Sequence, residues 1–186
     1  MPGALGKSHP LRIRASHLQE FKRRAIAYLR SEPQNDWEWL ALAQHHGLPT
    51  RLLDWTTNPL IALYFAVTAP AGNEDAAVFA YRHNLPAIDP QADPFSIERI
   101  ELYFPAHISD RFTAQHAVFT ANPESLRADA RKGRAAKRWI IAADSIPRIH
   151  GELRRLGLTQ TSLFPGLDSL CYELRETSNG FNPGRV

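Results

Sequence analysis

The chain has 186 residues, a length that predicts one domain with a hydrophobic core of its own. Its net charge of +3 permits an anionic partner without requiring one, and the single cysteine excludes both an internal disulfide and a cysteine-based zinc site. No stretch approaches the roughly 18 apolar residues of a membrane span, and residues 1–7 lack a signal-peptide pattern. We therefore expect a cytoplasmic protein with no membrane partner.

The N-terminal third predicts two helices. Residues 1–15 show no clear period and are expected to be irregular, whereas apolar side chains at helical spacing predict a helix over 18–29. A second helix is expected after an N-cap residue at position 35 or 36. It should end on Gln44-His45-His46, because Gly47 occupies the place of a left-handed C-terminal residue.

The rest of the chain alternates short strands with helices. A strand is expected over 50–55, and Asn58 and Pro59 begin a helix whose body, 60–67, is apolar all round and is therefore predicted to be buried. The later elements are expected as strands over 76–81, 100–104, 117–120 and 139–142, a basic loop or frayed helix over 121–138, amphipathic helices over 145–156 and 167–174 with Cys171 in the core, and a disordered tail over 177–186.

These elements predict an α+β domain over residues 16–176. Its sheet is expected to be small, mixed and mostly antiparallel, with helices on its flanks, because no regular strand–helix–strand repeat is present. The most unusual stretch is 44–56, which gathers two histidines, an arginine, an aspartate, a glutamine and hydroxyl side chains around a helix end and a strand. Because buried polar groups are costly unless paired, this stretch predicts a pocket or a structural hydrogen-bond network.

The stretch from Gln44 to Ala66 closely resembles the signature of the FRG-domain family. Two later segments, 111–120 and 163–168, are similar to the same family, and the resemblance extends over about residues 18–175. The Phe-Arg-Gly triplet that names the family is absent, so the chain is expected to be an N-terminally shortened member. The resemblance implies a bacterial protein of a defence or toxin system.

A second resemblance is to the arginine-type ADP-ribosyltransferase fold. The segment Asp54–Pro59 leading into Ala62–Ala66 is similar to its middle element, and Gln115 lies where the catalytic glutamate is expected. The resemblance implies NAD as cofactor and cleavage of a glycosidic C–N bond with transfer, which would make the protein a glycosyltransferase. The implied catalytic residues are His46, Arg51, Asp54 and Gln115, and the implied cofactor-binding residues are Gln44, His45, Thr50, Trp55, Thr56 and Tyr64.

Each implied role has an ordinary structural alternative. The histidines can bond the last carbonyls of their helix, and Trp55 can be core. Arg51 and Asp54, three residues apart on a strand, should face opposite sides and have separate partners. Gln115 supplies no negative charge for a developing oxocarbenium ion, and its amide suits a loop backbone instead. Whether the protein is an enzyme is therefore left open.

Two other functions remain open. A non-catalytic module that senses a nucleotide or nucleic acid is one, with a basic segment as the nucleic-acid contact. The other is a metal-dependent nuclease that uses His46 and Asp54, although adjacent histidines point in different directions and no metal is expected. A shortened N-terminus would leave an open sheet edge, which favours a homo-oligomer. The basic residues are Arg127, Arg131, Lys132, Arg134, Lys137 and Arg138.

Overall fold

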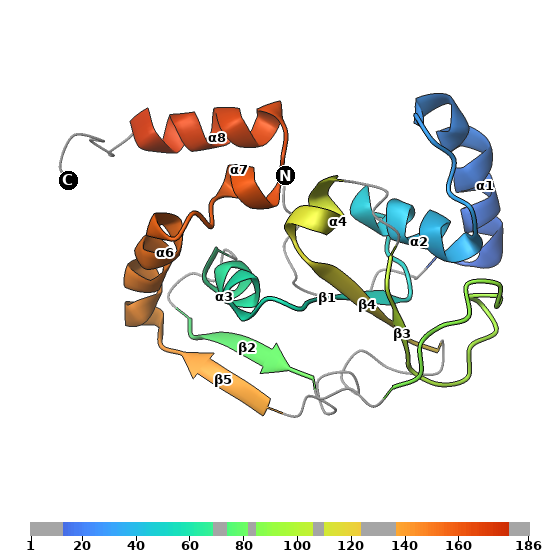
Figure 1. Ribbon diagram of the computed structural model, residues 1–186, viewed down its shortest axis with the longest axis horizontal. Coiled ribbons are helices and arrows are strands. Elements are labelled where there is room, and N and C mark those ends of the chain that lie inside the picture. The colour runs from blue at the N-terminus through green and yellow to red at the C-terminus, as the bar shows by residue number, and fades with distance from the viewer. Residues whose placement is uncertain (1–12, 69–73, 82–84, 106–109, 124–136, 179–186) are drawn as a thin grey trace. The chain divides into compact units, whose positions relative to one another are not determined.

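The computed structural model describes residues 13–68, 74–81, 85–105, 110–123 and 137–178. It confirms an α+β protein with small antiparallel sheets (Figure 1). In chain order its elements are α1 (Ala15–Ala25), the 3-10 helix η1 (Ile26–Tyr28), α2 (Asp36–His45), β1 (Leu52–Thr56), α3 (Pro59–Thr68), β2 (Ala76–Ala80), β3 (Glu101–Tyr103), α4 (Asp110–Ala114), β4 (Ala117–Ala121), β5 (Lys137–Ile141), the 3-10 helix η2 (Ala143–Ser145), α6 (Ile146–Arg155), α7 (Gln160–Leu163) and α8 (Leu167–Ser178).

The chain divides into two compact units, and each is described by itself. Unit 1 contains α1, α2 and most of the sheet of order β1-β4-β3, whereas unit 2 contains α3, α4, α6, α7 and α8. Unit 1 comprises Met1–Trp55, Phe79–Ile108 and Val118–Arg138. Unit 2 comprises Thr56–Val78, Ser109–Ala117 and Trp139–Val186. No helix in the described part of the chain is long and apolar enough to span a membrane.

The sheet of unit 1 is antiparallel. Strand β3 pairs with β4 in the register Leu102 opposite Thr120. The backbone N–H of Asn122 donates to the carbonyl of Arg51 (3.1 Å), so the residue before β1 meets the residue after β4. The last three residues of the central strand β4 are buried, and Phe119 is fully enclosed.

Aromatic side chains fill the core of unit 1. The indole of Trp37 on α2 lies 5.8 Å from the ring of Tyr103, which stacks on Phe119 at 6.1 Å. The indole N–H of Trp37 donates to the carbonyl of Ala92 (2.9 Å), so this fully buried tryptophan carries no unpaired donor. Trp39 is 4 % exposed and belongs to the core as well.

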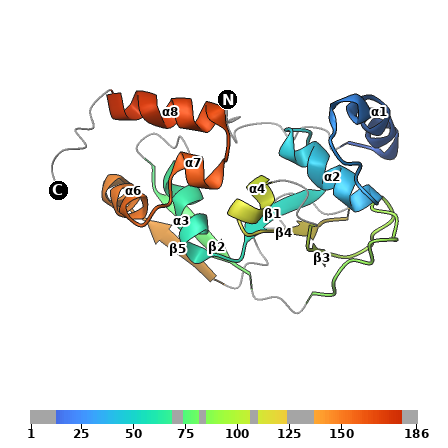
Figure 2. The ribbon, with the colours of Figure 1, turned by 45° about the horizontal axis from the view of Figure 1, so that its top comes forward.

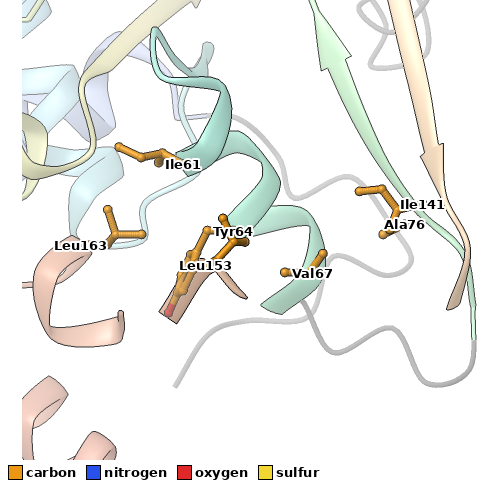
Figure 3. Packing of buried hydrophobic residues seen from close by; sticks show 7 residues of the cluster. All are labelled: Ile61, Tyr64, Val67, Ala76, Ile141, Leu153 and Leu163. Carbon is orange, nitrogen blue, oxygen red and sulfur yellow. The ribbon is translucent and has the colours of Figure 1, made fainter. Parts of the chain in front are cut away.

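The core of unit 2 forms around α3 (Figure 3). Ile61, Tyr64 and Val67 recur every three residues along α3 and belong to this cluster, and α3 packs against α6. The other side chains of the cluster come from β2, β5, α6 and α7, which Figures 1 and 2 show around α3. Those are Ala76, Ile141, Leu153 and Leu163.

The structure corrects several expectations about burial. Helix α3 is not buried all round, because Leu60 is 42 % and Phe65 37 % exposed. Cys171 is exposed on α8 rather than part of the core. In the strand predicted over 100–104, Leu102 and Tyr103 are both buried whereas Phe104 is exposed, so burial does not change from one residue to the next as it does in a half-buried strand. An apolar side chain lies in the core only where another element covers it, and the sequence pattern does not contain that information.

Candidate functional site

The polar stretch begins where α2 ends. The N–H of Gly47 donates to the carbonyl of Gln44 (2.9 Å), and the N–H of Leu48 donates to that of Ala43 (3.0 Å). With Gly47 at a φ of +90°, these bonds form a Schellman motif, the C-terminal cap predicted from the sequence. The cap fixes the direction in which the last turn presents Gln44, His45 and His46.

Gln44 links two residues of the following segment. Its Nε2 donates to Oδ2 of Asp54 (2.8 Å), and its Oε1 accepts from the hydroxyl of Thr50. The Thr50 hydroxyl in turn accepts from the backbone N–H of Leu52 (3.1 Å), and Thr50 is buried. The chain of bonds therefore runs from the interior of unit 1 to Asp54, whose side chain is exposed on β1. We call Gln44, Thr50 and Asp54 the polar relay.

The two histidines lie beside the polar relay at the end of α2. Their ring centroids are 4.9 Å apart and nearly perpendicular. His46, the C-cap residue, is exposed, and His45 is half-buried. Within the described ranges no group of three His, Cys, Asp or Glu side chains is placed to hold a metal ion. The exposed imidazole of His46 is the one that a ligand can reach from solvent.

Arg51 lies in the interior of unit 1. Only 4 % of it is exposed, and its guanidinium is 4.6 Å from the centroid of the Phe95 ring. The pKa of nearby Asp93 is lowered chiefly by the hydrogen bond from Ser96, then by that from the Phe95 N–H, and to a lesser extent by the Arg51 charge. The expected separation of Arg51 from Asp54 agrees with their burial, because one is buried and the other exposed.

Trp55 is half-buried in unit 1, on the opposite face of β1 from Asp54. Its indole N–H donates to the hydroxyl of Thr120 on β4 (3.1 Å), and its ring lies 5.6 Å from that of Tyr81. The donor of this indole is therefore used within the sheet, and only part of the ring is accessible.

Three of the predicted site residues lie in unit 2. Thr56 donates its hydroxyl to the carbonyl of Gln115 (2.8 Å) and accepts from the N–H of Asn58 (3.1 Å). The side chain of Gln115 donates to the carbonyl of Leu163 (3.0 Å). Thr56 and Gln115 thus connect the start of α3 with α4 and α7. The side-chain amide of Gln115 bonds a backbone carbonyl, which is the structural role named above as the alternative to a catalytic one.

Tyr64 is a core residue of α3. It is 3 % exposed, and its hydroxyl donates to Oε1 of Gln160 (3.3 Å). Burial raises the pKa of Tyr64, with smaller contributions from the neighbouring Tyr172 and Glu173. The ring of His150 lies 6.2 Å away, and burial lowers the pKa of that histidine. Tyr64 is thus a neutral, hydrogen-bonded core residue.

Within unit 1 the structure brings part of the predicted site together. Gln44, Thr50 and Asp54 form one hydrogen-bonded group with His45 and His46 beside it, whereas Arg51 and Trp55 lie elsewhere in unit 1. Thr56, Tyr64 and Gln115 belong to unit 2. Of the basic segment, Lys137 and Arg138 are exposed at the start of β5, and its other members lie outside the described residues.

Sequence reasoning missed Asn122, which is 1 % exposed. Its Nδ2 donates to the carbonyls of Arg51 (3.2 Å) and Thr120 (3.1 Å), so it fastens the start of β1 to the end of β4. The only signal in the sequence is an asparagine followed by a proline directly after a strand, a combination that is also typical of an exposed turn.

Comparison with known proteins identifies the N-terminal part of the chain. The model of the FRG domain family matches residues 4–75, a range that includes every predicted site residue except Gln115. No curated protein and no solved structure matches the chain. The limits of 16 and 176 for an FRG-like region, and its likeness to the ADP-ribosyltransferase fold, stay predictions. The chain carries an FRG domain over residues 4–75.

Proposed function

We propose that the FRG domain binds the ribose of a nucleotide such as NAD through the polar relay. The observation that carries the proposal is the Gln44 Nε2 bond to Oδ2 of the exposed Asp54. A carboxylate accepts hydrogen bonds from two neighbouring hydroxyl groups, and a carboxylate already held in place loses less side-chain entropy when it binds them. His46 is the second exposed polar group at this end of α2 and is the candidate for a further ribose contact.

The charges around the polar relay favour a sugar over a phosphate. The C-terminal end of α2 carries partial negative charge, and Asp54 is a carboxylate, so a phosphate placed here meets repulsion. The positively charged side chain of this stretch, Arg51, is buried with its guanidinium against Phe95. We therefore infer that hydroxyl donors of the ligand supply the recognition and that its phosphates extend away from this surface.

Binding without turnover is the function that the geometry supports best. The side chain of Gln115 is occupied by the carbonyl of Leu163 and carries no charge, so it offers a developing oxocarbenium ion no electrostatic stabilisation. This supports the sensing alternative over ADP-ribosyl transfer. Transfer activity, a metal-dependent nuclease, a nucleic-acid contact and a place in a defence or toxin system stay predictions.

The experiment compares ligands that differ by one hydroxyl group. Calorimetric titration of the full chain with NAD should show binding, and the 2′-deoxyadenosine and 3′-deoxyadenosine analogues should together identify the hydroxyls that Asp54 accepts from. Loss of a charge-assisted hydrogen bond predicts an affinity about tenfold lower or weaker still. Adenosine should bind nearly as well as AMP, because phosphate makes no favourable contact here. Equal binding of ribose and deoxyribose ligands would contradict the proposal.

A further inference from the structure

Helix α8 presents an exposed apolar row. Leu167 is 78 %, Leu170 42 % and Leu174 58 % exposed, and Cys171 between them is exposed as well. The four residues have the spacing i, i+3, i+4 and i+7, so they share one face of the helix. We call them the α8 stripe. A contiguous exposed apolar surface of this kind is typical of a protein-interaction site.

The other side of α8 is already attached to unit 2. Ser169 is 9 % exposed, and the carboxylate of Glu173 accepts from both the hydroxyl and the backbone N–H of Thr161 on α7. Figures 1 and 2 both show α7 directly before α8 and beside it. Residues 169 and 173 lie about a third of a turn from the centre of the α8 stripe, so α8 is fixed in its own unit while the stripe faces outward.

We propose that the α8 stripe binds the α8 stripe of a second copy of this chain, with the two helices antiparallel. Read in either direction the stripe has the order leucine, central pair, leucine, because Leu167 and Leu174 are equally distant from Leu170-Cys171. A two-fold axis through the central pair therefore places each end leucine against the opposite end leucine of the other copy. Such self-complementarity is what an isologous interface requires.

The charges beside the stripe fit the same arrangement. Asp168 and Arg175 lie on one flank of α8, about two turns apart and with opposite signs. In an antiparallel pair, residues of this flank meet the same flank of the other helix in reverse order. Asp168 of each copy therefore approaches Arg175 of the other, which gives two equivalent ion pairs. The Arg175 guanidinium also lies 5.7 Å from the Tyr172 ring, a contact that holds it on this flank.

The size of the surface sets the expected strength. A pair of helices of this length buries less than the about 1,200 Å² at the lower end of standard interfaces, so we expect reversible dimers with micromolar affinity. Sedimentation velocity of the full chain over a concentration series should show a monomer–dimer equilibrium. Leu170→Glu, at the centre of the stripe, should raise the dissociation constant at least about tenfold.

A matched control separates the stripe from apolar surface in general. Leu156, at the end of α6, is 67 % exposed and lies outside the stripe, so Leu156→Glu should leave the dissociation constant unchanged. Leu167→Glu repeats the test at a more exposed stripe position, and unchanged circular dichroism shows that each variant folds. A wild-type monomer at all concentrations, or dimers that survive both stripe substitutions, would overturn the proposal and leave the stripe to a different partner.

Charge exchange and cross-linking test the antiparallel geometry itself. Asp168→Arg and Arg175→Asp should each weaken the dimer, and the double variant should recover wild-type affinity, since the ion pairs are then rebuilt with reversed signs. A short bismaleimide should link the two copies through Cys171 near the axis, and Cys171→Ser should abolish the link. A double variant weaker than both single variants, or dimers that the reagent does not link, would overturn the antiparallel pairing.

Discussion

Substitution of Asn122 by alanine should destabilise unit 1 substantially. The side chain is 1 % exposed, and its Nδ2 donates to the carbonyls of Arg51 and Thr120. Each of these hydrogen bonds contributes about 1 kcal/mol net, and the space left by the amide adds about 1 kcal/mol if the sheet does not close over it. The free energy of unfolding should therefore fall by about 2 to 3 kcal/mol, a large share of a typical total of about 5 to 15 kcal/mol.

The assay is urea unfolding of the full chain followed by tryptophan fluorescence, because Trp37, Trp39 and Trp55 all lie in unit 1. Asn122→Asp keeps the shape of the side chain but presents an oxygen to both carbonyls, so it should cost at least as much as alanine. Gln19→Ala on the exposed face of α1 is the matched control, and it should change stability by less than about 0.5 kcal/mol. An Asn122→Ala variant within that same range, or an aspartate variant as stable as the wild type, would refute the reasoning.

The remaining predictions concern stability as well. Leu163→Ala should lower the free energy of unfolding by about 2 to 4 kcal/mol in urea, since Leu163 is 2 % exposed in the core of unit 2. Asn35→Ala should cost about 1 kcal/mol and shift the circular dichroism melt downward, because Oδ1 of Asn35 accepts from the N–H of Glu38 (3.0 Å) at the start of α2. The Thr161 hydroxyl is the main cause of the lowered pKa of Glu173. A folded pKa below the ordinary value stabilises the folded state above that value of 4.5, so Thr161→Val should be less stable than the wild type at neutral pH. Its deficit should shrink as pH falls through the lowered pKa, which urea titrations at several pH values would measure.

Much of the fold follows from local signals in the sequence. Gly47 predicted the end of α2, and Asn58 with Pro59 predicted the start of α3, because caps depend on backbone geometry that few residue types adopt. Both predictions are confirmed, with Oδ1 of Asn58 accepting from the N–H of Leu60 (2.9 Å). The helices α4 and α7 were not predicted, since five and four residues are too short for a periodic pattern.

Tertiary contacts are the part that the sequence does not specify. The apolar row of α8 predicted a helix correctly, but its placement in the core was wrong for Cys171, because Glu173 bonds Thr161 on α7 and Ser169 is the buried residue of this helix. Arg51 stood beside other polar residues in the sequence and was expected near a ligand, yet it packs against Phe95, which is 44 residues away along the chain. Such a pairing becomes visible only when distant segments are brought together.

The most direct test of the proposed function is the affinity of Asp54 variants for NAD. Calorimetric titration should compare the wild type with Asp54→Asn, while nicotinamide release is followed in the same samples. Asparagine replaces one carboxylate oxygen by an amide NH2 group, which donates instead of accepting, and it removes the negative charge. The affinity should therefore fall at least about tenfold, and the wild type should release no nicotinamide. Wild-type affinity in Asp54→Asn would contradict ribose recognition by the polar relay, and nicotinamide release by the wild type would contradict binding without turnover.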